Sequence, residues 1–364
     1  MIGRTLGLYF ARRFASAVAL IFMSCVTLIV LVDFLEMARR TADREQVTVT
    51  TLALLTIYRA PSFTEQLLPF AVLFGAMATF VMLSRRLELV VARAVGLSVW
   101  QFITPPVLVA FLVGIFASTV FNPVSADFKE RANQIEGEIF ASSSSAIMPQ
   151  GKKEFWVRQQ SVDGQAIIQA QASRQGGRVL SNVVVFEFDK AGLLLERVEA
   201  KTATLGDGAW ILTDARVLVP GLDLQSYDTY LIATKLDPKQ VQDSLIAPET
   251  VSFWQLPAAI RSAQQSGFGA EKYRLQLQSL LARPFLLVAM VLIAAVVGLR
   301  VFRFGGVGQT ILGGVLAGFL LYVGTKLAED LGEAGIVHPV AAAWFPAVTG
   351  ILVGVLILLH REDG

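Results

Sequence analysis

The chain contains 364 residues, of which 54% are hydrophobic and 16% are charged, and its mean hydropathy is +0.59. Soluble domains have about 45–50% apolar and about 25% charged residues. The composition therefore excludes an ordinary soluble protein and indicates an integral membrane protein. The net charge of +2 is too small to indicate a polyanionic partner. The single cysteine, Cys25, excludes an intrachain disulfide and is expected to pack within an apolar run.

Six apolar runs are long enough to cross a bilayer, which takes about 20 helical residues. We expect membrane spans at Phe14–Leu35, Ser62–Leu83, Gln101–Asn122, Leu280–Leu299, Gln309–Lys326 and Val340–Leu359. The first run is expected to be a retained span, because it is longer than a signal-peptide core and no small-x-small cleavage site follows it. Between the first two spans, Glu36–Pro61 is expected to be a polar loop.

The region Pro123–Ser279, between the third and fourth spans, has the pattern of a β-domain. Short runs rich in Val, Ile, Phe, Tyr or Trp alternate there with glycine-containing turns. These runs predict strands at Glu154–Gln160, Ala166–Ala172, Val179–Asp189, Leu193–Lys201, Ala209–Val219 and Ser226–Lys235. Short strands without intervening helices indicate an antiparallel sandwich or partial barrel. The alternation around Val183–Phe188 is imperfect and sets no register.

An amphipathic helix is predicted at Val251–Gly267, with Trp254 on its apolar face. The expected domain organisation is therefore residues 1–122 with three spans, residues 123–279 with the β-domain and this helical connector, and residues 280–364 with three further spans.

The arginines of the short connections predict the orientation of the chain in the membrane. The side that holds both chain ends has nine arginines, against four on the other side. The nine are Arg4, Arg12, Arg13, Arg85, Arg86, Arg93, Arg300, Arg303 and Arg361, and the four are Arg39, Arg40, Arg44 and Arg59. Because positive loops stay in the cytoplasm, both termini are expected to be cytoplasmic and the β-domain periplasmic.

The stretch Leu83–Ser98, between the second and third spans, is both charged and apolar. A charged residue near the centre of a span costs roughly 2.5–3.5 kcal/mol. The charges of Arg85, Arg86, Glu88 and Arg93 therefore exclude a span. The stretch is also too apolar for a free loop, since it contains Leu87, Leu89, Val90, Val91, Ala92, Ala94 and Val95. We predict a helix of about residues 84–98 that lies along the inner membrane face, ends at Gly96 and can meet a soluble partner.

The pattern Glu-Leu-Val-Val-x-x-Ala-x-Gly-(Leu/Phe)-(Ser/Thr), at Glu88–Ser98, resembles the coupling helix of the lipopolysaccharide-export ABC-transporter permeases of the LptF/LptG family. The six-span frame around one β-domain extends this resemblance over essentially the whole chain. Together with Lys272–Leu277, the pattern looks more like the G-type (LptG) subunit than its F-type (LptF) paralogue. The resemblance implies that Glu88 is the central contact to a cytoplasmic ATPase. It also implies that Arg85, Arg86 and Arg93 orient the helix against lipid phosphates or the partner.

The resemblance implies a permease subunit that extracts lipopolysaccharide from the inner membrane of a Gram-negative cell. Its fold would be six transmembrane helices with a jelly-roll-like periplasmic domain between helices 3 and 4, which passes the lipid on. The implied partners are an LptF-type permease, two LptB-type ATPase subunits, a single-span LptC-type protein and a periplasmic LptA-type bridge. No nucleic acid is implied, and ATP and Mg would be held by the ATPase.

The chain itself is expected to be non-catalytic and without a cofactor or metal. The glycine-rich turn Gly305–Thr310 lacks the lysine of a phosphate-binding loop, and no strand precedes it. His338 and His360 lie at opposite ends of one span and are expected to be interfacial residues.

Basic residues near the outer ends of the spans are candidates for lipid binding, since guanidinium groups bind phosphate bidentately. In the family, such residues around the first and fifth spans line a cavity that admits the lipid. The candidates are Arg39, Arg40, Arg59, Arg131, Arg283 and Lys326. The alternative is ordinary interfacial snorkelling and local ion pairing. Some members carry a basic residue near the end of the first span, at the position where this chain has Asp33. A carboxylate there argues against a phosphate contact at this position. Arg39 and Arg40 are therefore the better candidates.

Two other classes remain open at this level. A permease-like mechanotransmission protein would bind the ATPase but retain no lipid. A membrane-anchored assembly scaffold would need neither Glu88 nor an ATPase.

Overall fold

The computed structural model describes residues 4–42, 47–141, 155–160, 164–174, 179–189, 193–206, 208–221, 224–234, 247–265, 270–304 and 307–362. The chain divides into two compact units, which we call the helical unit and the sheet unit. The helical unit comprises Met1–Ala141, Glu249–Leu256 and Glu271–Gly364, and the sheet unit comprises Ser142–Pro248 and Pro257–Ala270.

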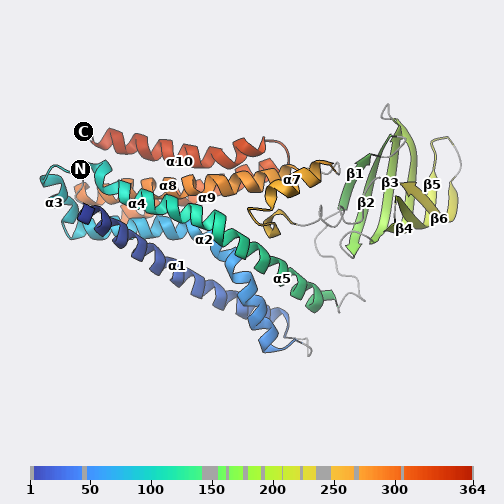
Figure 1. Cartoon of the computed structure of the whole chain (residues 1–364), viewed down its shortest axis with the longest axis horizontal. Coiled ribbons are helices and arrows are strands. Elements are labelled where there is room, and N and C mark those ends of the chain that lie inside the picture. Colours follow the sequence, from blue (N-terminus) through green and yellow to red (C-terminus); the bar gives the residue numbers. More distant parts are fainter. Residues whose placement is uncertain are drawn as a thin grey trace. The chain divides into compact units, whose positions relative to one another are not determined.

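The helical unit consists mainly of long helices (Figure 1). They are α1 (Arg4–Arg40), α2 (Val49–Arg85), α3 (Glu88–Ala94), α4 (Val99–Phe116), the π-helix η1 (Ala117–Phe121), α5 (Asn122–Ala141), α8 (Glu271–Phe304), α9 (Val307–Glu333) and α10 (Pro339–Glu362). Six segments are long and apolar enough to cross a membrane: Thr5–Arg40, Val49–Arg85, Val99–Glu136, Glu271–Gly298, Ile311–Glu333 and Pro339–His360. The prediction of six membrane-crossing helices is confirmed.

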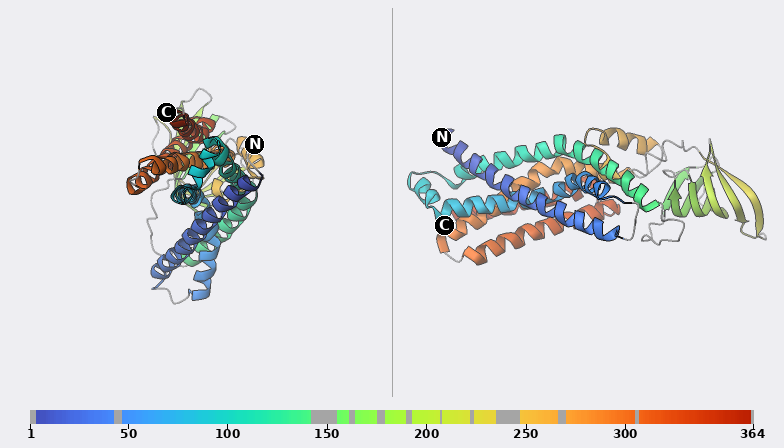
Figure 2. Two further views of the ribbon diagram at one scale, coloured as in Figure 1. Left: turned by 90° about the vertical axis from the view of Figure 1, so that its left-hand side faces the viewer. Right: turned by 90° about the horizontal axis from the view of Figure 1, so that it is seen from below.

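Both ends of the chain lie at the same end of the helical unit as α3 (Figures 1 and 2). We call this the α3 end. We use "far half" for the other half of the unit, where α1 ends and α2 begins.

The helices extend beyond the predicted spans. The prediction of a polar loop at Glu36–Pro61 is wrong, because α1 continues to Arg40 and α2 already begins at Val49. Met37, Leu52 and Leu55 are buried together and stabilise these helical extensions. Hydropathy detects only the apolar part of a helix. The helix itself can continue beyond that part where its side chains pack against neighbouring helices.

The helix of the third span likewise runs past the predicted boundary at Asn122. It passes through η1 into α5 and continues to Ala141, so residues that we assigned to the β-domain are helical. Pro123 follows Asn122 without ending the helix.

Two prolines explain how neighbouring helices are fastened together. Proline has no N–H, so the carbonyl four residues earlier loses its helical partner. For Pro284 in α8, that carbonyl is Leu280 O, and Ser118 Oγ donates to it at 2.7 Å. For Pro123, the carbonyl is Thr119 O, and Trp254 Nε1 donates to it at 3.0 Å. Each freed carbonyl is therefore satisfied by a side chain from elsewhere in the unit.

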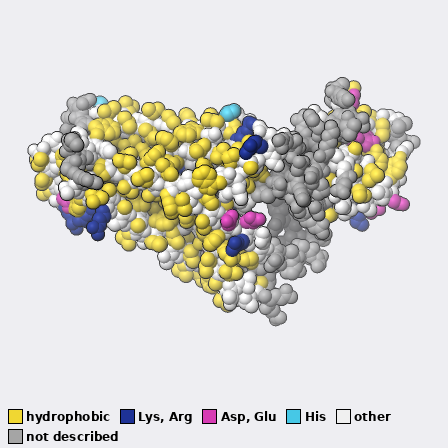
Figure 3. Space-filling view, in the orientation of Figure 1, with side chains coloured by type: hydrophobic (Ala, Val, Ile, Leu, Met, Phe, Trp, Pro, Cys, Tyr) yellow, Lys and Arg dark blue, Asp and Glu magenta, His cyan; other side chains and the backbone are white. Residues whose placement is uncertain are grey.

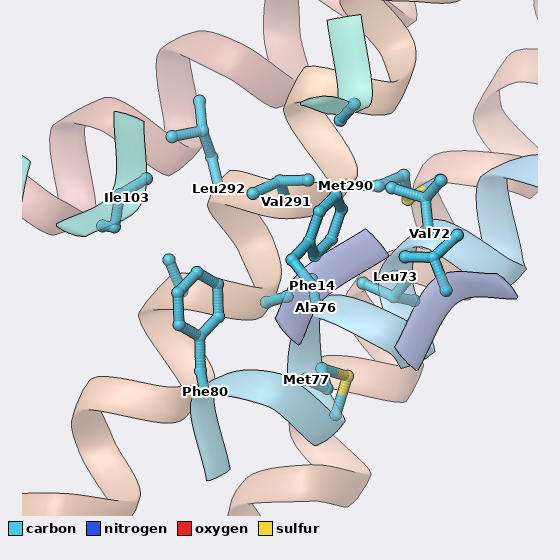
Figure 4. Close-up of a cluster of buried hydrophobic side chains, with 14 of the residues drawn as sticks. Phe14, Val72, Leu73, Ala76, Met77, Phe80, Ile103, Met290, Val291 and Leu292 are labelled. Atoms are coloured by element: carbon cyan, nitrogen blue, oxygen red, sulfur yellow. The ribbon is translucent and has the colours of Figure 1, made fainter. Parts of the chain in front are cut away.

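The core of the helical unit is formed by α1, α2, α4 and α8 (Figure 4). Phe14, Phe80, Ile103 and Met290 are at most 2% exposed. Small residues allow close approach of the helices. A Cβ atom added to Gly114 would lie 2.4 Å from the Cα of Pro284, so α4 and α8 are in contact through their backbones there.

The outer surface of the helical unit is predominantly apolar, and charged side chains gather toward its two ends (Figure 3). Large apolar residues of α1, α9 and α10 are exposed, among them Leu20, Leu28, Leu316, Leu320, Leu352 and Leu356. Such faces suit the hydrocarbon of a bilayer or further membrane helices.

The described strands of the sheet unit form one six-stranded antiparallel sheet in the order β1-β2-β3-β4-β5-β6. The strands are β1 (Phe155–Gln160), β2 (Gly164–Arg174), β3 (Val179–Asp189), β4 (Leu194–Leu205), β5 (Ala209–Leu218) and β6 (Gln225–Ala233). The prediction of a β-domain between the third and fourth spans is confirmed. Neighbours in sequence are neighbours in the sheet, so these strands form a meander, which is a simpler order than that of a jelly roll.

The imperfect alternation in the sequence has a structural cause. Asn182 and Asp214 have φ of 49° and 53°, a left-handed conformation that Asn and Asp tolerate better than most residues. In a regular strand every second residue faces the same side. At Asn182 this spacing is interrupted, so the buried residues Leu180 and Val183 of β3 are three residues apart. The same apolar face, which includes Trp210, stays buried on both sides of the irregularity.

The predicted helix at Val251–Gly267 is shorter than expected. Helix α7 spans Leu256–Gln265, and residues 266–269 lie outside the described residues. Trp254 precedes α7, so its assignment to the apolar face of that helix is wrong. Pro257 lies in the first turn of α7, where a missing N–H is tolerated.

Candidate functional site

The short helix α3 begins and ends at two backbone irregularities. Leu87 separates it from α2 by adopting φ of 60°. At the other end Gly96 has φ of +86°, its N–H donates to Arg93 O, and the N–H of Leu97 donates to Ala92 O. This pair of hydrogen bonds is the Schellman arrangement that ends many helices. The predicted helix end at Gly96 is therefore present in the structure. The predicted extent of about residues 84–98 is wrong, because Arg85 still belongs to α2 and the left-handed Leu87 delays the start of α3 to Glu88.

Helix α3 has one buried and one exposed apolar face. Leu89 is 3% exposed and packs into the core of the helical unit. Leu87, Val91 and Val95 are 60%, 62% and 78% exposed. Val91 lies within α3, and Leu87 and Val95 are the residues directly before and after this helix. An exposed apolar stripe of this kind suits contact with another protein or with lipid.

The charged residues around this stripe have different surroundings. Arg85, Arg86 and Arg93 are exposed, and they have no ion-pair partner within the described part of the chain. Glu88, in the first turn of α3, is half-buried. The α3 end therefore exposes both charged side chains and the apolar stripe on its surface.

Two residues of α1 hold Glu88 in place. Tyr9 donates its hydroxyl hydrogen to Glu88 Oε2 at 3.0 Å, and Arg13 Nε donates to the Tyr9 oxygen at 3.1 Å. The Arg13 guanidinium also lies 5.3 Å from the centre of the Tyr9 ring. No local sequence pattern indicates this contact, because Tyr9 and Glu88 are far apart in the chain and Tyr9 resembles an ordinary interfacial tyrosine.

In the far half, the structure surrounds Arg59 with acidic side chains. Its guanidinium lies 3.3 Å from Asp33 of α1 and forms a second ion pair with Glu136 of α5. The Arg59 side chain is only 21% exposed. Asp33, which we expected to weaken a phosphate contact, is thus one of two carboxylates that neutralise Arg59.

Arg283 and Lys326 lie around a small cavity of about 90 Å³ between α2, α8, α9 and α10. Arg283 forms an ion pair with Glu65, and Lys326 Nζ lies 2.8 Å from Glu329. The cavity thus carries two basic and two acidic side chains. The hydroxyl of Ser279, also in the cavity wall, is buried and has no hydrogen-bond partner among the described residues.

The remaining basic candidates are more accessible. Arg39 and Arg40 at the end of α1 are exposed, and Arg40 pairs with Glu36 one turn earlier. Arg131 is exposed on α5 and its guanidinium lies 6.0 Å from the centre of the Tyr58 ring. Exposed ion pairs of this kind are weak, so these guanidinium groups can reach an external phosphate at little cost.

Comparison with known proteins identifies the chain's family. Residues 8–361 match the family described as "Lipopolysaccharide export system permease LptF/LptG". The chain belongs to this family. It is also similar to the lipopolysaccharide export system permease protein LptG of Escherichia coli strain K12, with 22% identity over 320 residues, covering 84% of this chain and 85% of the relative. The LptG protein of Escherichia coli O6:H1 matches with the same identity and coverage.

This LptF/LptG-family permease is a multi-pass protein of the inner membrane, and its family is a component of a lipopolysaccharide transporter. The predicted family and the architecture of six helices with one β-domain are both confirmed. Among the described residues of the permease, no three His, Cys, Asp or Glu side chains lie close enough together to hold a metal ion.

Proposed function

We propose that this chain is the G-type permease subunit of the ABC transporter that extracts lipopolysaccharide from the inner membrane and passes it toward the outer membrane. The observation that carries this proposal is the geometry of α3. It is a short helix with a Schellman C-terminus, an exposed apolar stripe, an oriented carboxylate, and basic residues that have no ion-pair partner among the described residues. These features suit a groove on a soluble partner protein. The match to LptG relatives supports the G-type assignment.

The orientation of the proposed transporter subunit follows from its arginines. The α3 end holds both chain ends and the arginine-rich connections, so it would face the cytoplasm. The sheet unit would then be periplasmic. The even number of membrane-crossing helices among the described residues would return the chain to its starting side, so that both ends share one side of the membrane.

The ATP-hydrolysing groups would belong to partner subunits. We propose two LptB-type ATPases, of which one docks on α3, together with an LptF-type permease as the second membrane subunit. An LptC-type protein and an LptA-type bridge would receive the lipid. This chain would then act without a cofactor of its own, with ATP and Mg held by the ATPases.

Force from the ATPase would enter through α3 and spread into the core. Leu89 transmits contact from α3 to the buried residues of the helical unit, and Glu88 ties α3 to α1 through Tyr9. Since cores are close-packed and of low compressibility, a displacement of α3 would be passed to α1 and α2 with little loss. Movement of these helices would narrow a lipid-holding cavity of the kind that the family resemblance implies.

We propose that exposed arginines make the first contact with the lipid phosphates. Arg39, Arg40 and Arg131 are accessible in the far half. Arg59, Arg283 and Lys326 already have carboxylate partners. They would bind phosphate only where the phosphate displaces a carboxylate, which makes them candidates for a later step of transport.

The experiment that tests this proposal is co-purification of the soluble ATPase from membranes with the unmodified chain, Glu88→Lys and Glu130→Lys. Glu130 is exposed on α5 and provides a control with the same change of charge. We expect Glu88→Lys to lose the ATPase while keeping the paired permease and bound lipopolysaccharide. The proposal fails if the ATPase does not accompany the unmodified chain, or if both variants retain it equally.

A further inference from the structure

Asn122, the first residue of α5, joins two parts of the helical unit through its side-chain amide. Nδ2 donates to Glu65 Oε1 of α2 at 3.0 Å, and Oδ1 accepts from the backbone N–H of Phe253 at 3.0 Å. The residue is only 2% exposed. Both ends of a buried amide are thus satisfied, which makes its removal costly.

The Glu65 carboxylate extends this contact to α8 through its ion pair with Arg283. The Glu65 and Arg283 side chains are 10% and 19% exposed, so solvent screens the pair only weakly. A continuous polar chain therefore runs from α8 through α2 and α5 to Phe253. Hydrogen bonds in such chains strengthen one another when all members are satisfied.

The receiving backbone belongs to Glu249–Leu256, which we call the return segment. It brings the chain back into the helical unit after the strands of the sheet unit, whereas α5 carries the chain out of the helical unit. Trp254 and Glu249 also fasten the return segment, through the Thr119 carbonyl and through an ion pair with Lys129 of α5. The helix that leads into the sheet unit and the return segment, after which the chain enters the sheet unit again at Pro257–Ala270, are therefore tied to each other.

The π-helix η1 determines where the Asn122 side chain lies. Over Ala117–Phe121 the hydrogen bonds span five residues, as the bond from Asn122 N to Ala117 O shows. This change of helical phase accompanies the burial of Ser118 and Asn122, which contact α8 and α2. Such π-helical turns are often found at functional sites.

We propose that Asn122 is a positioning residue that fixes the return segment to α2 and α8. A displacement of α2 or α8 is then passed through the two Asn122 hydrogen bonds to the return segment, which adjoins the sheet unit in the chain. We call these two hydrogen bonds the Asn122 joint, and the joint is closed when both are formed. The inference rests on the proposed function, because the displacement comes from partner ATPases. Asn122 acts through the return segment and contacts no substrate.

The test compares ATP hydrolysis with lipid transfer in the complete transporter in proteoliposomes, with a soluble LptA-type protein as the acceptor. We expect Asn122→Ala to lower the lipopolysaccharide transferred per ATP about tenfold, the effect of roughly 1.4 kcal/mol. Trp254→Phe removes a more exposed hydrogen bond and should lower the ratio by about threefold or less. ATP hydrolysis should change by less than about twofold in both variants.

The two control variants remove an asparagine side chain and an indole hydrogen bond at positions away from Asn122 and Trp254. Asn133→Ala changes an exposed asparagine of α5, and Trp344→Phe removes an indole hydrogen bond of 2.9 Å to Gln278. Both controls should keep the normal ratio. A purely structural role of Asn122 would reduce the amount of assembled complex and leave the ratio unchanged, and that result would overturn the proposal.

A cross-link between positions 122 and 253 tests whether the contact between α5 and the return segment must stay formed during transport. In a Cys25→Ala chain, Asn122→Cys and Phe253→Cys would lower the ratio, and a short thiol cross-linker between them should restore it. Failure of the cross-link to restore transfer contradicts the closed joint. If the unmodified complex neither binds ATPase nor moves lipid, the proposed function fails instead.

Discussion

The two ends of the helical unit use arginine in opposite ways. At the α3 end, Arg85, Arg86 and Arg93 are exposed and lack an ion-pair partner among the described residues. In the far half, Arg59 and Arg283 are mostly buried and each is held by a carboxylate. The first arrangement leaves charge available to a partner, whereas the second uses charge to hold helices together. The residue type alone does not distinguish them.

The difference should appear most strongly when the Arg283–Glu65 pair is broken. Arg283→Ala leaves a mostly buried Glu65 carboxylate without its counter-ion, so we expect a loss of about 3–5 kcal/mol in the free energy of unfolding. Unfolding in mixed detergent measures this loss.

Arg93→Ala provides the comparison at the α3 end and should cost less than about 0.5 kcal/mol. Adding Glu65→Gln to Arg283→Ala should recover much of the stability, because the unpaired charge is removed. Equal costs for the two arginine variants would contradict the distinction between the ends.

A smaller effect is expected at the end of α3. Gly96→Ala places a side chain at φ of +86° and should destabilise the helix end by about 1–2 kcal/mol. Amide hydrogen exchange of α3 should accelerate. Gly324→Ala is the matched change within α9, where a Cβ meets open space, and should be neutral or stabilising by up to about 1 kcal/mol. Unchanged exchange in α3 would contradict the role of Gly96.

The contact between α1 and α3 predicts a still smaller effect on partner binding. Tyr9→Phe removes the hydroxyl that orients Glu88 and should weaken ATPase binding about fivefold, the equivalent of roughly 1 kcal/mol. The effect should vanish in a Glu88→Ala background, because the two residues then no longer interact. Tyr58→Phe in the far half serves as the control. An undiminished effect without Glu88 would show that Tyr9 acts elsewhere.

In the sheet unit, an effect of about the same size is expected from Tyr230. Burial and the hydrogen bond to Glu196 raise the pKa of the Tyr230 hydroxyl above its usual value of 10.0. The folded state therefore holds this proton more tightly than the unfolded state. Its contribution to stability is complete below pH 10.0 and declines as the pH rises above that value.

Tyr230→Phe should cost about 1 kcal/mol at neutral pH and should show a weaker decline at alkaline pH. Urea unfolding followed by the circular-dichroism signal of the sheet measures both. An identical pH dependence in the two proteins would exclude Tyr230 as its source.

Local patterns in the sequence were sufficient for much of the fold. Apolar run length predicted the six helices, and the combination of arginines with apolar residues predicted α3. Gly96 at the end of α3 was predictable because a single residue type meets its backbone requirement. These features depend on neighbours within a few turns of the chain.

The tertiary contacts could not be predicted in this way. The partners of Arg59 and Arg283 lie on other helices, so an arginine that looked free for phosphate was found beside a carboxylate. The same holds for Asn122, which resembled a helix boundary beside Pro123 and proved to be a buried contact. The sheet irregularity at Asn182 and Asp214 likewise depends on backbone angles that hydropathy does not report.

ATP-dependent extraction of lipopolysaccharide from proteoliposomes that contain the assembled transporter shows whether α3 couples a partner ATPase to lipid transport. We expect extraction with the unmodified chain and with Glu130→Lys, and loss of extraction with Glu88→Lys. Extraction by Glu88→Lys at the normal rate, or ATP hydrolysis by the unmodified complex without any movement of lipid, would contradict the claim that α3 couples a partner ATPase to lipid transport.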